Sequence, residues 1–128
     1  MLLHLTDLSD EPLQSQISRQ IRANILAGEL TADSSLPSIR AMAREQHVSV
    51  ITVQRAYEHL LREELIHSRR GKGFFVSNVS KQNKKEISKQ RLMDNLERPL
   101  IAAIDEGLPA PEIIKIVKKI IEKINNQK

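Results

Sequence analysis

The sequence predicts a mainly helical α+β fold, in which an N-terminal domain, 1–78, is followed by a helical C-terminal segment, 79–128. Three observations predict this fold. Two short stretches with the apolar spacing of helices lie close together between residues 38 and 62. A Gly-Lys-Gly turn between two strand-like runs follows them. From about residue 84 the spacing is again helical almost to residue 128.

The first helix is expected from Pro12 to Ala27. Proline suits the first turn of a helix, and the acidic residues just before it suit the positive end of the helix dipole. Gly28 is expected to end the helix. Its apolar face repeats at every fourth residue, at Leu13, Ile17, Ile21 and Ile25.

Two short helices joined by a tight turn are expected next. Ser38 can cap the first helix, and Pro37 disfavours an earlier start. His47 and Val48 form the turn, and Ser49 can cap the second helix. This arrangement predicts a helix-turn-helix, whose second helix enters the DNA major groove. The second helix has an apolar stripe, which comprises Val53, Ala56, Tyr57, Leu60 and Leu61.

A β-hairpin with a basic tip is expected after these helices. Residues 65–70 and 74–76 could form its strands, because the glycines between them can adopt the positive φ of a tight turn. Arg69, Arg70 and Lys72 would lie at a tip that suits phosphates or the minor groove. A helix-turn-helix followed by such a hairpin is a winged helix-turn-helix.

Three motifs of this region resemble a known family. They are Leu-Pro-Ser-x-Arg at 36–40, Val-Ser-x-x-Thr-Val-x-x-Ala-Tyr at 48–57, and Gly-x-Gly-x-Phe-Val at 71–76. In order and spacing they resemble the GntR family of bacterial transcription regulators, and the Ala-Tyr pair and short tail resemble its YtrA subfamily. The resemblance covers about residues 10–78 by motif and the tail by length. It implies a homodimer that binds double-stranded operator DNA, with a role near operons for membrane transporters.

Two positions depart from the pattern of the family. Relatives usually have Pro-Gly near Ala32 and Asp33, which leaves the shape of this loop open. They usually have glycine at Glu64, at the end of the recognition helix. A glutamate in a left-handed conformation would cost about 1 kcal/mol. Either that cost is borne, or the turn differs.

Arg40 is the strongest candidate for contact with DNA. The resemblance implies that it reaches a base edge or a phosphate, and an arginine that donates two hydrogen bonds to guanine discriminates by about 1–3 kcal/mol. The alternative is a solvated arginine on the helix surface. Ser49 and Thr52 could contact phosphates at the start of the second helix, where free N–H groups favour anions; Ser49 could also be a cap only.

The candidates for reading bases lie on the second helix of the helix-turn-helix. Gln54 and Arg55 are candidates, although Arg55 could instead form a surface salt bridge with Glu58 or His59. Relatives often have arginine or asparagine at Val50 and Ile51, which here either meet thymine methyl groups or leave base reading to other residues. The expected DNA-binding residues are Ser38, Arg40, Ser49, Val50, Thr52, Gln54, Arg55, Arg69, Arg70, Gly71, Lys72 and Gly73.

A short C-terminal helical hairpin for dimerisation is expected after a lysine-rich link, 77–85. Pro99 would kink or break its first helix, and residues 107–111 separate the two helices. Two such helices bury little surface alone, so we expect the tail to pair with the tail of a second copy of the chain. The alternative is that the tail folds back onto its own winged helix. A twofold dimer matches a palindromic operator. The expected dimerisation residues are Leu92, Leu96, Leu100, Ile104, Ile113, Ile116, Val117, Ile120, Ile121 and Ile124.

Composition excludes several classes of protein. The chain has no cysteine, and its four histidines show no metal-ligand spacing, so we expect no metal site and no cofactor. It also lacks a nucleophile motif and a phosphate loop, so we expect no catalytic residues and no enzyme. No apolar run could cross a bilayer and no signal sequence opens the chain, which predicts a cytoplasmic protein without a membrane partner.

Charge is unevenly distributed along the chain. Residues 1–79 contain nine Lys or Arg and nine Asp or Glu, net zero, and residues 80–128 contain eleven and seven, net +4. The DNA-binding domain is therefore not basic overall, which predicts moderate non-specific affinity for DNA.

On these grounds we expect a sequence-specific transcriptional regulator. Repression is expected rather than activation, because a small dimer on a promoter most simply occludes polymerase. Two alternatives remain open. One is a winged-helix protein-interaction module without direct DNA binding. The other is a repressor gated by a small-molecule effector at the junction of tail and winged helix.

Overall fold

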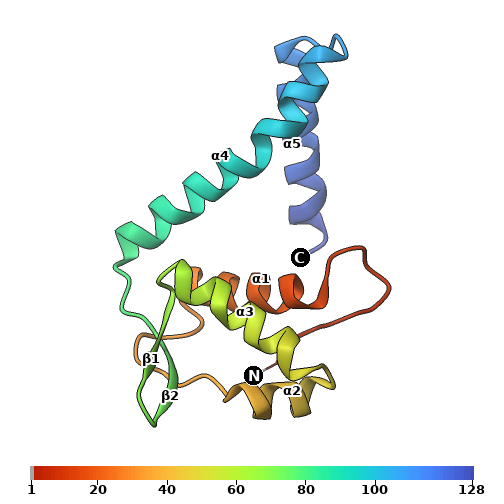
Figure 1. Cartoon of the computed structure of the whole chain (residues 1–128). Coiled ribbons are helices and arrows are strands. Elements are labelled where there is room, and N and C mark those ends of the chain that lie inside the picture. Colours follow the sequence, from red (N-terminus) through yellow and green to blue (C-terminus); the bar gives the residue numbers. More distant parts are fainter. Residues whose placement is uncertain (1) are drawn as a thin grey trace. The chain divides into compact units, whose positions relative to one another are not determined.

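The computed structural model describes residues 2–128, which form five helices and a two-stranded sheet. The elements run α1 (Leu13–Leu26), α2 (Ile39–Gln46), α3 (Val50–Arg62), β1 (Ile66–Arg69), β2 (Gly73–Val76), α4 (Lys81–Asp105) and α5 (Ala110–Asn126) (Figure 1). This confirms the mainly helical α+β fold. The chain divides into two compact units, 1–85 and 86–128, so the division falls inside α4, seven residues after the boundary expected from sequence.

Three helices and the hairpin build the N-terminal unit. Both α1 and α2 pack against α3, and β1 follows α3 closely (Figure 1). The apolar stripes expected from sequence face one another in the core of this unit. Each of their large buried residues is less than 2% exposed. These residues are Ile17, Ile21 and Ile25 of α1, Met42 of α2, and Val53, Tyr57 and Leu60 of α3.

Side-chain caps begin the two short helices. The Ser38 hydroxyl accepts a hydrogen bond from the backbone N–H of Ala41 at 3.1 Å, and the Ser49 hydroxyl accepts one from Thr52 at 3.1 Å. His47 lies between the helices with a φ of 56°. The caps and the turn of the helix-turn-helix are thus confirmed.

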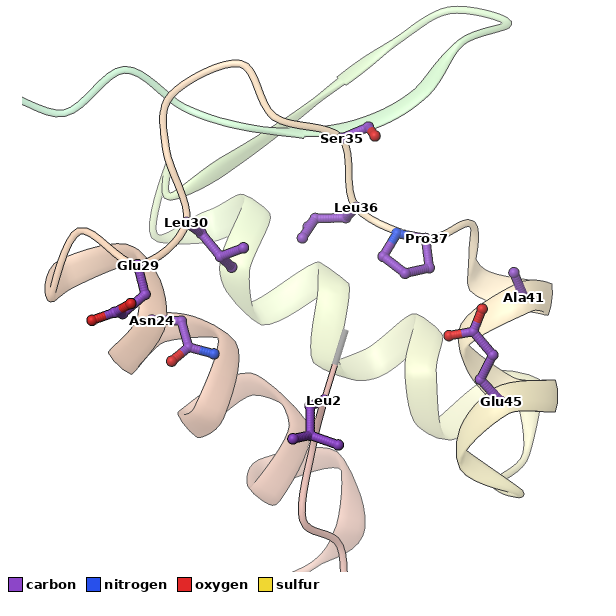
Figure 2. A pocket seen from close by; sticks show the side chains of 9 residues that line it. All are labelled: Leu2, Asn24, Glu29, Leu30, Ser35, Leu36, Pro37, Ala41 and Glu45. Carbon is purple, nitrogen blue, oxygen red and sulfur yellow. The ribbon is translucent and has the colours of Figure 1, made fainter.

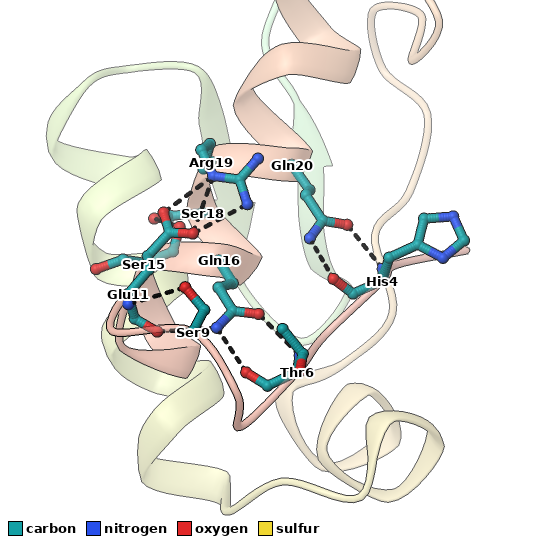
Figure 3. Close-up of polar contacts among 9 residues, drawn as sticks. All are labelled: His4, Thr6, Ser9, Glu11, Ser15, Gln16, Ser18, Arg19 and Gln20. Carbon is teal, nitrogen blue, oxygen red and sulfur yellow. Dashed lines mark hydrogen bonds and ion pairs between the residues drawn. The ribbon is translucent and has the colours of Figure 1, made fainter. Parts of the chain in front are cut away.

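The segment before α1 is held by two glutamines rather than by strand pairing. Gln16, which is 1% exposed, donates from Nε2 to the carbonyls of Thr6 at 2.9 Å and Glu11 at 2.8 Å. Its Oε1 accepts from the Thr6 N–H at 3.0 Å. Gln20 makes the same pair of bonds with the backbone of His4, both at 2.8 Å (Figure 3). The side-chain amides satisfy backbone groups that a neighbouring strand would otherwise satisfy.

Glu64 adopts the left-handed conformation that glycine usually supplies, with a φ of 59°. Its N–H donates to the carbonyl of Leu61 at 3.0 Å, and the N–H of Leu65 donates to Leu60 at 3.1 Å. These two bonds form a Schellman motif that ends α3. The conformational cost at Glu64 is therefore borne, and the turn keeps the ordinary geometry.

A loop segment pairs with the two-stranded sheet. β1 and β2 pair antiparallel from Ile66 opposite Val76 to Arg69 opposite Gly73. On the other side of β2, the Asp33 N–H donates to the Val76 carbonyl at 2.8 Å, and the Leu36 N–H donates to Phe74 at 2.9 Å. Residues 33–36 thus act as a third, short partner of the hairpin, which the sequence did not predict.

Two long helices form most of the C-terminal unit. α4 continues through Pro99, so the proline does not end the helix. The helix changes direction along its length (Figure 1). Gly107, with a φ of 93°, follows α4, and the Leu108 N–H donates back to Ala103 at 3.0 Å. After this turn α5 runs back in the opposite direction, as a helical hairpin requires (Figure 1).

No residue of α4 or α5 is buried within the chain. Ile87, Leu96, Leu100 and Ala103 of α4 are half-buried, as are Ile113 and Val117 of α5. The remaining large apolar side chains are 41–66% exposed. These exposed residues are Leu92, Met93, Ile101, Ile104, Leu108, Ile114, Ile116, Ile120, Ile121 and Ile124.

Candidate nucleic-acid interface

The first turn of α2 presents an arginine to solvent. Ser38 caps this helix, and Arg40 follows in its first turn and is exposed. Among residues 2–128, no hydrogen bond or ion pair engages the Arg40 side chain. Its guanidinium is therefore available to an external acceptor such as a phosphate or a guanine.

Tyr57 fixes the position of this turn. Its side chain is 1% exposed, and its hydroxyl donates a hydrogen bond to the Pro37 carbonyl at 2.7 Å. Its ring meets Phe74 of β2 edge to face at 5.0 Å between centroids. Burial, with a smaller contribution from the charge of Glu45, raises the pKa of Tyr57 well above its usual value, so the hydroxyl remains a donor. One core residue of α3 thus connects the start of α2 with the hairpin.

The first turn of α3 exposes two apolar side chains beside two hydroxyls. Val50 is 41% exposed and Ile51 is 59% exposed. Ser49 Oγ lies 2.8 Å from Thr52 Oγ1 and also caps the helix, so the serine has an intramolecular role before any ligand binds. The early N–H groups of a helix lack intrahelical partners and favour anions.

Gln54 and Arg55 lie one turn further along α3, and both are exposed. Gln54 Nε2 donates to Glu58 Oε1 at 3.3 Å. Arg55 makes no ion pair with Glu58 or any other acidic side chain within residues 2–128. His59 instead accepts from Arg62 at 2.8 Å, so the alternative salt bridge at Arg55 does not form.

The hairpin tip exposes Arg70, Gly71 and Lys72. Gly71 has a φ of 74° and Gly73 a φ of 105°. A Cβ at either glycine would meet nothing within 4 Å, so backbone conformation and not space calls for glycine here. In Figure 1 the tip and α2 both lie at the lower edge of the N-terminal unit.

Arg69 differs from its neighbours at the tip because it is already engaged. Its Nη2 donates to Asp33 Oδ1 at 2.9 Å, and its guanidinium carbon lies 4.4 Å from the centroid of the Phe75 ring. Asp33 is a residue of the candidate interface that was not predicted from the sequence. It is separated from Arg69 by 36 residues, and no periodic or local signal links the two.

Ion pairing concentrates the free positive charge of residues 1–79 on the three elements described above. Three of the nine Lys and Arg residues are paired with carboxylates, namely Arg19 with Glu11, Arg22 with Glu63, and Arg69 with Asp33. The other six have no acidic partner among residues 2–128 and are Arg40, Arg44, Arg55, Arg62, Arg70 and Lys72. All six lie on α2, α3 or the hairpin. A domain with no net charge thereby presents a positive surface on these elements.

A half-open pocket of about 770 Å³ is lined by residues of α1, of the loop before α2 and of α2 itself (Figure 2). Leu30, Leu36 and Pro37 supply much of its apolar lining, and Glu29 and Glu45 supply negative charge. None of its described lining residues is a lysine or arginine. The pocket therefore does not suit phosphate and is not part of the candidate interface.

Residues 2–128 show no gathering of three His, Asp or Glu side chains that could hold a metal ion. None of the helices in this range has the length and apolar character needed to cross a lipid bilayer.

The helix-turn-helix followed by a hairpin defines a winged-helix domain of the DNA-binding class. Residues 13–76 match the family model for bacterial regulatory proteins of the gntR family. The chain is also 31% identical over 119 residues to the uncharacterized HTH-type transcriptional regulator YhcF of Bacillus subtilis, covering 89% of this chain and 93% of that one. The chain therefore belongs to the GntR family of bacterial regulatory proteins.

Two further relatives differ in how much of their own length the similarity covers. The HTH-type transcriptional repressor YtrA of Bacillus subtilis is 26% identical over 127 residues, covering 99% of this chain and 98% of YtrA, in agreement with the predicted subfamily. The probable rhizopine catabolism regulatory protein MocR of Rhizobium meliloti is 42% identical over 71 residues. That match covers 56% of this chain and only 14% of MocR.

Solved structures support the same assignment. A GntR family transcriptional regulator from Listeria monocytogenes superposes with a TM-score of 0.72 at 28% identity, covering 90% of this chain and 98% of that one. The AraR DNA-binding domain in complex with operator ORX1 superposes with a TM-score of 0.51 at 27% identity, covering 59% and 93%. The expected winged helix and its class, a DNA-binding regulator of transcription, are thus confirmed.

Proposed function

We propose that this protein is a cytoplasmic homodimeric repressor, without enzymatic activity, that binds a palindromic operator. The observation that carries the proposal is the placement, on α2, α3 and the hairpin, of all six basic side chains of residues 1–79 that have no acidic partner within residues 2–128. In a helix-turn-helix the second helix enters the major groove while the first crosses the backbone. Basic side chains on these elements neutralise phosphates and supply most of the non-specific affinity.

Within this function Arg40, Arg55 and Lys72 take different roles. Arg40 and Arg55 reach base edges or phosphates from α2 and α3, and Lys72 contacts phosphate or the minor groove from the hairpin. Ser49 and Thr52 contribute the N-terminus of α3 to a phosphate. The AraR domain, whose structure contains operator DNA, supports this use of the fold.

The dimer is supported by the C-terminal unit. Its two helices leave apolar side chains such as Ile116, Ile120 and Ile124 about half exposed, and bury none. An exposed apolar face of this kind is costly in water and is normally covered by a partner. A second copy as that partner would form a twofold dimer, which matches an operator with two half-sites about one helical turn apart. The dimer represses by occluding polymerase.

The test is selection from a random duplex library by the purified protein, with no added small molecule, at about 0.15 M salt, where long-range phosphate attraction is partly screened. We expect a palindromic consensus. Arg40→Ala and Lys72→Ala should each weaken the free energy of binding to that consensus by roughly 1–3 kcal/mol. Arg19→Ala is the matched control, because Arg19 lies on α1 and is paired with Glu11. This variant should bind the consensus as the wild type does.

Two results would contradict the proposal. Absence of enrichment, or operator binding that persists unchanged in Arg40→Ala and Lys72→Ala, would favour a winged helix that binds protein. A consensus without twofold symmetry would contradict the dimer.

A further inference from the structure

Val50 and Ile51 are exposed at the start of the recognition helix. The buried face of α3 comprises Val53, Ala56, Tyr57 and Leu60, each at most 1% exposed. Successive residues of an α-helix are separated by about 100° around the axis, which places Ile51 almost opposite the middle of that face. Ile51 therefore points outward along the same ridge as Arg55, one turn later. Val50 is about 100° from Ile51 around the axis and lies at the border of the buried face, 41% exposed.

Exposure alone does not distinguish these residues, because single exposed apolar side chains are ordinary. Leu2 and Leu8 of the same unit are 80% and 97% exposed. The difference is position. Val50 and Ile51 are consecutive and occupy the first turn of the helix that a helix-turn-helix inserts into DNA, where the side chains nearest the helix N-terminus meet base edges.

The major-groove edges of the four bases offer these side chains one matching group. Adenine, guanine and cytosine present hydrogen-bond donors and acceptors there, and only thymine adds a methyl group. Valine and isoleucine can neither donate nor accept a hydrogen bond. Against guanine or cytosine they would remove water from polar groups without replacing its hydrogen bonds, which is costly. Against thymine they bury a methyl group.

We propose that Val50 and Ile51 read thymine methyl groups, so that each operator half-site carries thymine where the first turn of α3 meets the major groove. This inference rests on the proposed function and specifies it further, because it assigns sequence preference to side chains that carry no polar group. Arg55 remains the neighbouring polar contact on the same ridge.

The test is a uracil scan of the operator obtained by selection. Each thymine is replaced in turn by deoxyuridine, which removes the 5-methyl group and keeps base pairing and every hydrogen-bonding group. We expect one or two thymines in each half-site at which wild-type affinity falls about fourfold, the effect of burying one methyl-sized group. At those positions Ile51→Ala or Val50→Ala should bind the thymine and uracil operators equally.

Leu8→Ala is the matched control. It also shortens an exposed apolar side chain of the N-terminal unit, away from α3, and should keep the full sensitivity to uracil. Because Val50 and Ile51 are exposed, neither alanine variant is expected to unfold, and circular dichroism checks this.

The outcomes separate this inference from the proposed function. An operator that is bound equally well with uracil at every position overturns the inference and leaves operator binding intact, as does a uracil sensitivity that both alanine variants retain. Half-sites without thymine overturn it in the same way. Failure to select any operator overturns both.

Discussion

At the scale of single residues, Asp33 limits the charge that the hairpin offers to DNA. It holds Arg69 at 2.9 Å, and both side chains are substantially exposed, 65% for Asp33 and 47% for Arg69. A surface pair of this kind contributes little to stability, so a phosphate can compete with the carboxylate for the arginine.

We predict that Asp33→Asn tightens operator binding. Asparagine tolerates the φ of 64° at this position, and it removes the charge that opposes Arg69. If Arg69 gains one phosphate, the slope of log K against log salt concentration should steepen by about 0.9. Fluorescence anisotropy at several salt concentrations measures this slope.

Asp10→Asn is the control for Asp33→Asn, because it removes the same charge from an exposed site with no ion pair among residues 2–128. It should change the slope much less. Weaker binding by Asp33→Asn would show instead that the carboxylate orients Arg69 for its contact.

Glu64 bears a conformational cost that can be removed. We predict that Glu64→Gly stabilises the protein by roughly 0.5–1 kcal/mol, because glycine adopts a φ of 59° without strain, although it also gains freedom in the unfolded chain. Urea denaturation measures the difference in the free energy of unfolding.

The same substitution at Glu58, inside α3, should have the opposite sign. Glycine in a helix interior is destabilising by about 1 kcal/mol. If both variants were destabilised alike, backbone strain at Glu64 would not be the reason for the first prediction.

At the scale of elements, one ion pair connects α1 with the end of α3. Arg22 donates from Nε to Glu63 at 2.8 Å and from Nη2 at 2.6 Å, a two-pronged contact in which the arginine side chain is only 12% exposed. Such pairs are both stronger and more directional than single surface contacts.

We predict that Arg22→Ala destabilises the N-terminal unit by roughly 1–3 kcal/mol, since it leaves a partly buried carboxylate without its main partner. Arg19→Ala, which breaks the more exposed pair with Glu11, should cost less than about 1 kcal/mol. Thermal unfolding of both variants tests the contrast, and equal effects would contradict it.

The elements that sequence predicted well are those fixed by neighbouring residues. Ser38 and Ser49 each cap the helix that follows, and helical spacing alone identifies the buried stripe of α3. The pairing of residues 33–36 with β2 was not predicted, because it joins backbones that are far apart in the chain and no side-chain pattern indicates it. The bonds from Gln16 and Gln20 to the N-terminal segment were missed for the same reason.

The candidate interface divides in the same way. The exposure of Arg40 and Lys72 follows from local structure that the sequence indicates. The capture of Arg69 by Asp33 does not, because it depends on how a loop before α2 meets the hairpin. Pro99 is a third case. Proline disfavours a helix interior, yet α4 continues through it, because the hydrogen bond lost at the proline does not outweigh the rest of a helix of 25 residues.

At the scale of the whole molecule, the exposed apolar face of α5 makes the proposed dimer testable. We predict that Ile120→Glu yields a monomer, because an unpaired carboxylate in an apolar interface costs roughly 3–5 kcal/mol. Ile120 is 50% exposed and is not part of a buried core, so helix content should persist. Sedimentation velocity measures the mass, and affinity for the palindromic operator should fall at least tenfold.

Lys119→Glu is the control for Ile120→Glu. It introduces the same carboxylate one position earlier, among the lysines of α5, and should remain dimeric. A wild-type protein that sediments as a monomer would contradict the proposed dimer directly.

Tyr57 also gives the protein a built-in optical probe. The chain has one tyrosine and no tryptophan, and that tyrosine is buried between α3, the start of α2 and the hairpin. Ultraviolet emission therefore reports on the N-terminal unit alone, whereas far-ultraviolet circular dichroism reports on the helices of both units. Recorded together on one unlabelled sample during heating, the two signals would coincide if the units melt as one cooperative body and would separate if each melts independently.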